Sequence, residues 1–100
     1  MKPYKRSERV AHELFRILSE ALLFEVKDPR VQGITILRVD ISDDLRFAKV
    51  FYETSKEEAV EGLESAKGFL RSVVARELGI KFTPEITFVR VENGWISQYI

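Results

Sequence analysis

The chain has 100 residues, with 16 Lys and Arg balanced by 16 Asp and Glu, so its formal net charge is zero. This length supports one domain around one hydrophobic core, and we expect residues 1–100 to form it. The absence of cysteine excludes disulfides and thiolate metal sites. No apolar run approaches the roughly 18 residues of a membrane span, and "MKPYKRSERV" lacks the apolar core of a secretory signal, so a cytoplasmic protein is expected.

The first predicted element is an amphipathic helix over about residues 7–27. Ser7 is a candidate N-cap, and Asp28-Pro29 favours a stop because proline disfavours helical geometry in the residue before it. The segment "RVQG" then suits a turn. Apolar side chains recur with a period of 3.6 residues at Val10, Leu14, Ile17, Leu18, Ala21, Leu22 and Val26.

Two strands are predicted next, over about residues 33–41 and 46–54. The short link "SDDL" between them is rich in turn-forming residues and favours an antiparallel hairpin. On the second strand, alternation places Phe47, Lys49 and Phe51 on the face opposite Ala48 and Val50. These three side chains either form a platform on which RNA bases stack or cover the edge of the core, and the pattern leaves both interpretations open.

The second helical region is predicted as two helices, over about 56–67 and 69–78. Ser55 and Glu58 have the spacing of a capping box, and Gly79 suits a C-cap. Gly68 lies inside an otherwise continuous apolar pattern, where glycine costs about 1 kcal/mol relative to alanine. A last strand is predicted over about 85–91, followed by a turn at Asn93-Gly94.

The predicted element order is therefore αββααβ. The connection from the second to the third strand is long enough to return parallel, and such crossovers are almost always right-handed. The fold class is α+β, with a three-stranded mixed sheet, three helices on one face and the other face open.

Charge is distributed unevenly along this neutral chain. Residues 53–64 are mostly acidic, and the sign changes at about residue 66. A neutral protein can present one basic face to a nucleic acid, although solvated helix faces produce the same pattern. The candidate RNA-binding residues are Lys67, Arg71, Arg76 and Lys81 beyond the sign change, with Lys2, Lys5, Arg6 and Arg9 at the N-terminus.

The sequence offers no constellation for catalysis. His12 is the only histidine and has no second ligand at metal spacing. Asp43 and Asp44 suit a turn rather than acid–base chemistry. None of the glycines belongs to a phosphate-binding motif, and no nucleophile elbow is present. We expect no enzyme activity, no cofactor, no metal and no small-molecule substrate.

Four segments in order resemble the ribosome-binding factor A family of bacterial small-subunit assembly proteins. They are "VKDPR" at 26–30, "VDISDDLRFAKVFY" at 39–52, "AKGFLRS" at 66–72 and "PEITFV" at 84–89. The resemblance covers nearly the whole chain. The family's usual basic C-terminal tail has no clear counterpart in "GWISQYI".

The resemblance implies a type II K-homology-like fold. The G-x-x-G loop of most such domains is missing, and Ala66-Lys67-Gly68 matches the family's Ala-x-Gly joint, so a helix–kink–helix is expected there. At Gly68 the joint adopts non-helical angles and leaves backbone groups open to a ligand, or the glycine only permits close packing.

Two functions follow as alternatives. By resemblance, a monomer binds the immature 30S subunit and assists 16S rRNA processing near the 5′-terminal helix and decoding region, especially at low temperature. Alternatively, the chain is a protein-interaction module without direct RNA contact, which zero net charge and the missing G-x-x-G favour.

Overall fold

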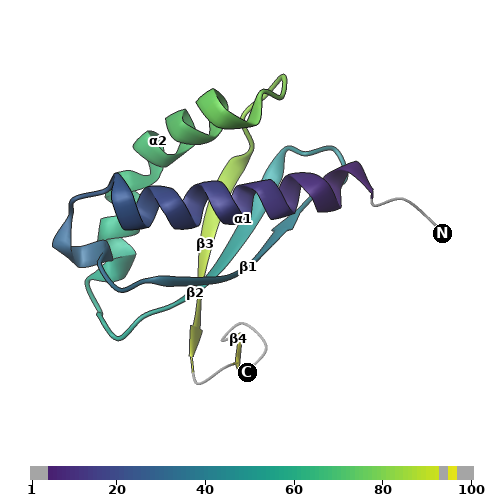
Figure 1. Cartoon of the computed structure of the whole chain (residues 1–100). Coiled ribbons are helices and arrows are strands. Elements are labelled where there is room, and N and C mark those ends of the chain that lie inside the picture. Colours follow the sequence, from purple (N-terminus) through teal and green to yellow (C-terminus); the bar gives the residue numbers. More distant parts are fainter. Residues whose placement is uncertain (1–4, 93–94, 97–100) are drawn as a thin grey trace.

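A computed structural model describes residues 5–92 and 95–96 and shows an α+β fold in two layers, with two α-helices packed on one face of a sheet (Figure 1). A short 3-10 helix, η1, links the first helix to the sheet. In chain order the elements are α1 (Arg6–Phe24), η1 (Pro29–Val31), β1 (Thr35–Ile41), β2 (Phe47–Glu53), α2 (Ala59–Leu78), β3 (Glu85–Glu92) and β4 (Trp95–Ile96).

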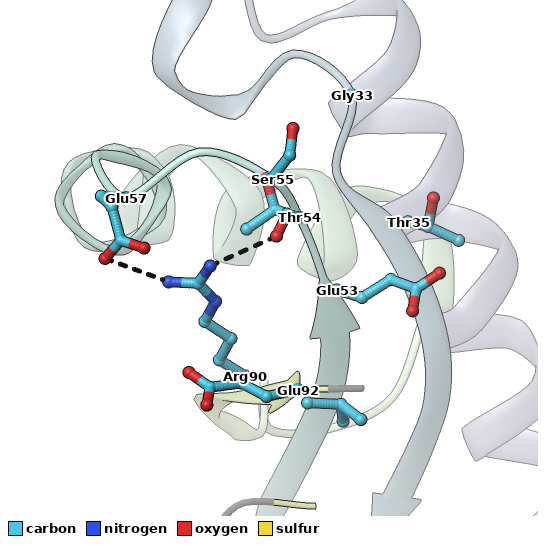
Figure 2. Close-up of a pocket in the computed structure, with 9 residues that line it drawn as sticks. Gly33, Thr35, Glu53, Thr54, Ser55, Glu57, Arg90 and Glu92 are labelled. Carbon is cyan, nitrogen blue, oxygen red and sulfur yellow. Dashed lines mark hydrogen bonds and ion pairs between the residues drawn. The ribbon is translucent and has the colours of Figure 1, made fainter. Parts of the chain in front are cut away.

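The sheet confirms the predicted mixed topology. β1 pairs with β2 antiparallel, and β2 pairs with β3 parallel in the register Phe47↔Glu85. At the other end of this pair, the Arg90 guanidinium donates to the carbonyl of Thr54, just beyond β2 (Figure 2). The short β4 pairs antiparallel with β3 and extends the predicted three-stranded sheet by one strand. The predicted turn at Asn93-Gly94 lies outside the described residues.

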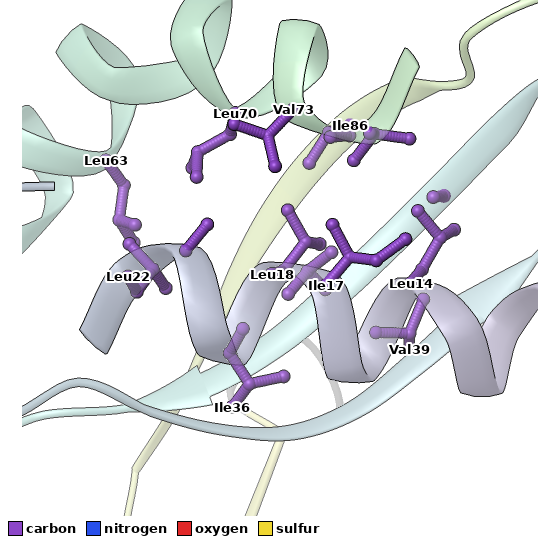
Figure 3. Packing of buried hydrophobic residues seen from close by; sticks show 14 of the residues in the cluster. Leu14, Ile17, Leu18, Leu22, Ile36, Val39, Leu63, Leu70, Val73 and Ile86 are labelled. Carbon is purple, nitrogen blue, oxygen red and sulfur yellow. The ribbon is translucent and has the colours of Figure 1, made fainter. Parts of the chain in front are cut away.

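The apolar stripe of α1 forms the centre of the core, as predicted. Leu14 and Leu18 are fully buried and point between the sheet and α2, in one cluster with Leu63, Leu70 and Ile86 (Figure 3). These residues come from α1, α2 and β3, so one cluster joins both layers.

The ends of α1 differ from the prediction. Its N-cap is Lys5, and Ser7 lies inside the helix, where its hydroxyl is buried and donates to Asp43 at 3.4 Å. The helix ends at Phe24, before the Asp28-Pro29 pair. That pair instead begins η1, with Pro29 in its first turn and Asp28 as its N-cap.

An irregularity in β1 places its apolar residues. The register shifts between Ile36 and Arg38, so Leu37 is an extra residue on this strand. Ile36 and Val39 both reach the core although they are three residues apart, whereas Leu37 is exposed. A bulge of this kind breaks the simple alternation that a sequence pattern assumes.

The predicted break at Ala66-Lys67-Gly68 is wrong, because α2 is one continuous helix of 20 residues. The fold therefore has two α-helices rather than three, in the order αββαβ. Of the described glycines, Gly33 and Gly79 have positive φ, and Gly68 does not. Gly79 is the left-handed C-cap that was predicted. The predicted capping box is absent, since the N-cap is Glu58 and makes no side-chain cap hydrogen bond.

The glycine that permits close packing is Gly62, six residues before Gly68. A Cβ at Gly62 would lie 2.8 Å from Cβ of Arg30 and 2.9 Å from Cγ1 of Val31, so α2 rests directly on η1. A Cβ at Gly68 would meet no atom within 4 Å. Two glycines of one helix therefore have opposite surroundings.

We expect opposite effects from alanine at these two positions. Gly68→Ala should raise the free energy of unfolding by up to about 1 kcal/mol, because alanine is the better helix former and the site is open. Gly62→Ala should lower it by about 1–3 kcal/mol, because η1 must shift to accommodate the methyl group. Urea unfolding with an unchanged slope measures both. A destabilised Gly68→Ala would mean that the helix does not run regularly through this residue.

Stability should also depend on pH through η1. The Asp28 carboxylate accepts from the Arg30 guanidinium at 2.6 Å and from the Arg30 backbone N–H at 2.9 Å. These hydrogen bonds lower the pKa of Asp28 below its ordinary value. The carboxylate therefore stabilises the fold above the unfolded-state pKa of about 4, and this contribution disappears as the pH falls through the lower folded-state value.

The variant Asp28→Asn cannot titrate at this position. Its urea midpoint should lie below that of the parent protein at pH 7, and the difference should shrink below about pH 4. A difference that stays constant from pH 7 to pH 3 would show that the charge of Asp28 has no part in stability.

Candidate nucleic-acid interface

The predicted basic residues of α2 do not form one face. Lys67 and Arg71 lie one turn apart on the same side of the helix, whereas Arg76 lies about 140° around the axis from Arg71 at 100° per residue. Arg71 is half-buried, and its guanidinium donates to the carbonyls of Thr83 and Pro84, at 3.3 Å each. Arg71 therefore holds the loop between α2 and β3.

The other two basic residues of α2 have carboxylate partners. Arg76 is 3.4 Å from Glu25, beyond the end of α1, and 3.4 Å from its neighbour Glu77. Lys67 is 3.1 Å from Glu64, one turn earlier in the same helix. Arg71 binds backbone carbonyls and Arg76 pairs with carboxylates, so both side chains have a structural role within the fold.

The N-terminal basic residues have a different environment. Lys5, Arg6 and Arg9 are exposed, and none forms an ion pair within residues 5–92 and 95–96. Lys2 lies outside the described residues. A hollow of about 450 Å³ separates the start of α1 from the end of α2, and Arg6 and Arg9 line it together with Leu78 and Ile80. Lys81, which is also exposed, follows immediately.

The hairpin turn between β1 and β2 lies at this same end of the molecule (Figure 1). The hydrogen bond from Ser7 to Asp43 ties the turn to α1, and the Glu85 backbone N–H donates to the Arg46 carbonyl at 2.8 Å. Three segments distant in sequence thus meet here. We call this region the basic end and define it by the exposed residues Lys5, Arg6, Arg9, Arg46 and Lys81.

The basic end also carries acidic side chains, and one of its basic residues, Arg46, was not predicted from the sequence. Glu8, Asp43, Asp44 and Glu85 are exposed there. Asp44 accepts from the Ser42 hydroxyl and the Arg46 backbone N–H, which lowers its pKa. Arg46 was not among the predicted residues, because only the return of the chain through α2 places it beside the loop that holds Lys81.

A second hollow lies beside Ala66, on the side of α2 that faces the end of α1. It measures about 290 Å³ and is lined by the segment Glu25–Asp28 on one side and by Ser65, Ala66 and Phe69 on the other. Ala66 is buried, whereas Gly68 is exposed and leaves open space where a side chain would stand. Gly68 does not line this hollow, but the helical surface at Gly68 is itself low, so another molecule can approach the α2 backbone closely there.

The open face of the sheet does not carry the three-residue platform that one interpretation of the sequence proposed. Phe47 and Lys49 are exposed, but Phe51 is 3% exposed and is covered by the Arg38 guanidinium, 4.5 Å from the ring centroid. Arg38 is itself held by Asp40 at 3.0 Å. Phe51 therefore packs, and Phe47 is the member of the set that stays accessible.

A polar pocket of about 580 Å³ opens at the opposite end of β2 and β3 (Figure 2). Arg90 lies in it, but its guanidinium donates to the Thr54 carbonyl and is 3.5 Å from Glu57. Glu53 and Glu92 add negative charge to the lining. This pocket therefore repels a phosphate group.

The part of the chain that the structure describes offers neither a metal site nor a helix suited to a bilayer. Its residues include no group of three or more His, Asp or Glu side chains placed to hold a metal ion. Within the same residues, neither α-helix combines the length and apolar character that crossing a membrane requires.

Comparison with known proteins identifies the family. The model of the family described as ribosome-binding factor A matches residues 6–93. A protein of that name from Thermodesulfovibrio yellowstonii is 43% identical over 97 residues, which cover 93% of this chain and 82% of the relative. Another, from Methylobacillus flagellatus, is 44% identical and covers 89% of this chain and 74% of its own length.

Solved structures agree with these sequence matches. A solution structure of a putative ribosome-binding factor A from Thermotoga maritima is 37% identical, with a TM-score of 0.74, and covers 88% of this chain and 89% of its own. The crystal structure of the Thermus thermophilus factor is 26% identical, with a TM-score of 0.77 over 84% of this chain and 93% of its own. A homology model of the Thermus factor has also been fitted into a cryo-EM map of a 30S–RbfA complex; it is 24% identical, with a TM-score of 0.74, and covers 92% of this chain and 97% of its own. Matched along residues 6–93 in sequence and over 88% of its length in fold, the chain belongs to the ribosome-binding factor A family.

Proposed function

We propose that this protein binds the free, immature 30S ribosomal subunit and assists 16S rRNA processing and late subunit maturation, above all at low temperature. The observation that carries the proposal is the family match along residues 6–93. The 30S complex of the Thermus thermophilus relative supports the same partner. We place the contact near the 5′-terminal helix of 16S rRNA and the decoding region, and we expect a cytoplasmic monomer that acts without catalysis or cofactor.

We also propose that the fold is a variant of the type II K-homology domain in which the two central helices are fused. The observed order αββαβ is the expected order αββααβ with its two central helices joined into one. In place of a protruding G-x-x-G loop, the continuous helix has the low surface at Gly68, bordered by Lys67. An RNA backbone can approach this surface because no side chain stands between it and the helix.

The phosphate contacts come from two regions in this proposal. At the basic end, Lys5, Arg6, Arg9 and Lys81 are exposed and able to turn toward phosphates. On α2, Lys67 can leave Glu64, because a surface ion pair contributes only about 0–1 kcal/mol. Arg71 and Arg76 act indirectly, through the loop and the helix end that they hold.

The alternative is a protein-interaction module without RNA contact. It is favoured by the zero net charge and by the internal partners of Lys67, Arg71 and Arg76. The two functions differ in their response to salt. Binding through phosphate contacts weakens linearly with the logarithm of the salt concentration, whereas an apolar protein contact responds little.

A salt titration of binding to 30S subunits tests the basic end. The triple variant Lys5→Gln, Arg6→Gln, Arg9→Gln should bind more weakly, and its salt slope should fall by roughly one for each phosphate that the variant can no longer bind. The control is Arg16→Gln on the same helix, because Arg16 is held between Glu13 and Glu20 at 3.0 and 3.2 Å. An unchanged slope in a folded triple variant would remove the N-terminal residues from the interface, and a flat slope for the parent protein would favour the protein-interaction module.

A bulkier side chain at Gly68 tests the low surface. Gly68→Leu should leave the fold intact, because open space surrounds this position, but should reduce binding to 30S subunits at least tenfold by blocking the backbone approach. Ala75→Leu is the matched control, since Ala75 is exposed on the same side of α2 two turns further on. Co-sedimentation measures binding, and urea unfolding checks the fold. Equal binding by both variants would exclude this surface from the contact.

A further inference from the structure

Two exposed phenylalanines meet at the basic end. Phe47, the first residue of β2, is 61% exposed, and Phe82, in the loop between α2 and β3, is 62% exposed. Both line one hollow of about 300 Å³, together with Arg46, Thr83 and Glu85. Neither ring belongs to the hydrophobic core, so the core does not explain them.

The loop that carries Phe82 is held in place on the C-terminal side of this residue. The Arg71 guanidinium donates to the carbonyls of Thr83 and Pro84, the two residues that follow Phe82. The Glu85 backbone N–H donates to the Arg46 carbonyl, next to Phe47. These bonds hold the backbone next to both aromatic residues before any ligand binds, so little backbone entropy is lost when one does.

Positive charge accompanies the two rings. The Lys81 ammonium lies 5.5 Å from the centroid of the Phe82 ring, and Arg46 lines the hollow. Exposed aromatic rings beside cations are the usual components of sites for unpaired nucleic acid, where bases stack on the rings and cations follow the phosphates. An apolar protein segment would use the rings but not the charges.

We propose that this hollow binds one unpaired RNA nucleotide, with its base against Phe47 and Phe82 and its phosphate beside Arg46 and Lys81. The inference rests on the proposed function, because it assumes that the protein binds rRNA.

Glu85 adds selectivity for the base. Its carboxylate accepts hydrogen bonds but cannot donate them, so it favours a base whose exposed edge presents N–H donors, as guanine does, and disfavours uracil, whose edge presents mainly acceptors.

Fluorescence anisotropy with short, labelled, unpaired RNAs tests the proposal on the full chain. Phe47→Ala and Phe82→Ala should each weaken binding by about tenfold, within the range observed when a stacking aromatic is removed. Phe82→Tyr should keep most of the affinity, because the ring remains. Phe24→Ala is the matched control, since Phe24 is 71% exposed at the C-terminal end of α1, away from the hollow. Urea unfolding confirms that each variant is folded.

Oligonucleotides that differ in one unpaired base test the role of Glu85. The parent protein should prefer a guanine-containing RNA to one made of uracil alone, and Glu85→Gln should reduce this preference several-fold while strengthening binding of the uracil RNA. An unchanged preference would show that Glu85 does not contact the base.

Sedimenting the same variants with 30S subunits distinguishes a failure of the proposed nucleotide site from a failure of the proposed function. Undiminished RNA binding by both alanine variants, or no binding of unpaired RNA by the parent protein, would overturn the inference even if 30S binding persists. Alanine variants that keep their RNA affinity but leave the subunit would show that the hollow contacts a ribosomal protein. Failure of the parent protein to join 30S subunits would overturn the proposed function itself.

Discussion

The parallel pairing of β2 and β3 is the constraint on which the rest of the structure depends. To pair Phe47 with Glu85, the chain must return from the end of β2 to its start. Seven strand residues span about 23 Å, and 20 helical residues span about 30 Å. One straight helix therefore covers the return, whereas a break in the middle would shorten its reach. The cost of Gly68, about 1 kcal/mol, is small against the packing that a continuous α2 secures.

The continuous helix also gives a structural cause for the change of charge along the chain. Glu61 lies in the first turn of α2 and Arg76 in the last, and this arrangement complements the helix macrodipole. Glu64 and Lys67 then form an ion pair at the point where the sign changes. The acidic and basic halves of this segment are therefore explained without RNA, so the change of charge by itself does not support an RNA surface on α2.

Sequence reasoning succeeded where one strong pattern determined the outcome and failed where neighbours in space decided it. The stripe of α1 and the hairpin follow from periodicity and turn chemistry, and the Gly79 cap follows from residue type. The predicted break at Gly68 was taken from a resemblance, and it is wrong because α2 continues through this residue. Gly62 is the glycine that the contact with η1 requires, but nothing in the sequence distinguishes it. Lys5, Arg6 and Arg9 were predicted as candidates, but nothing in the sequence shows that Arg71 holds a loop, that Arg38 covers Phe51, or that Phe82 lies beside Phe47.

The N-terminal cations and the aromatic hollow at the basic end would contribute to RNA affinity in different ways. Contacts from Lys5, Arg6 and Arg9 to phosphates gain free energy from released counterions, so their contribution falls as salt rises. Stacking on Phe47 and Phe82 depends on apolar contact and changes little with salt. A chain of zero net charge has little long-range attraction for RNA, since its own acidic residues offset its basic ones. In our proposal such a protein depends on a site where rings and cations already lie close together, and the loop held by Arg71 would provide one.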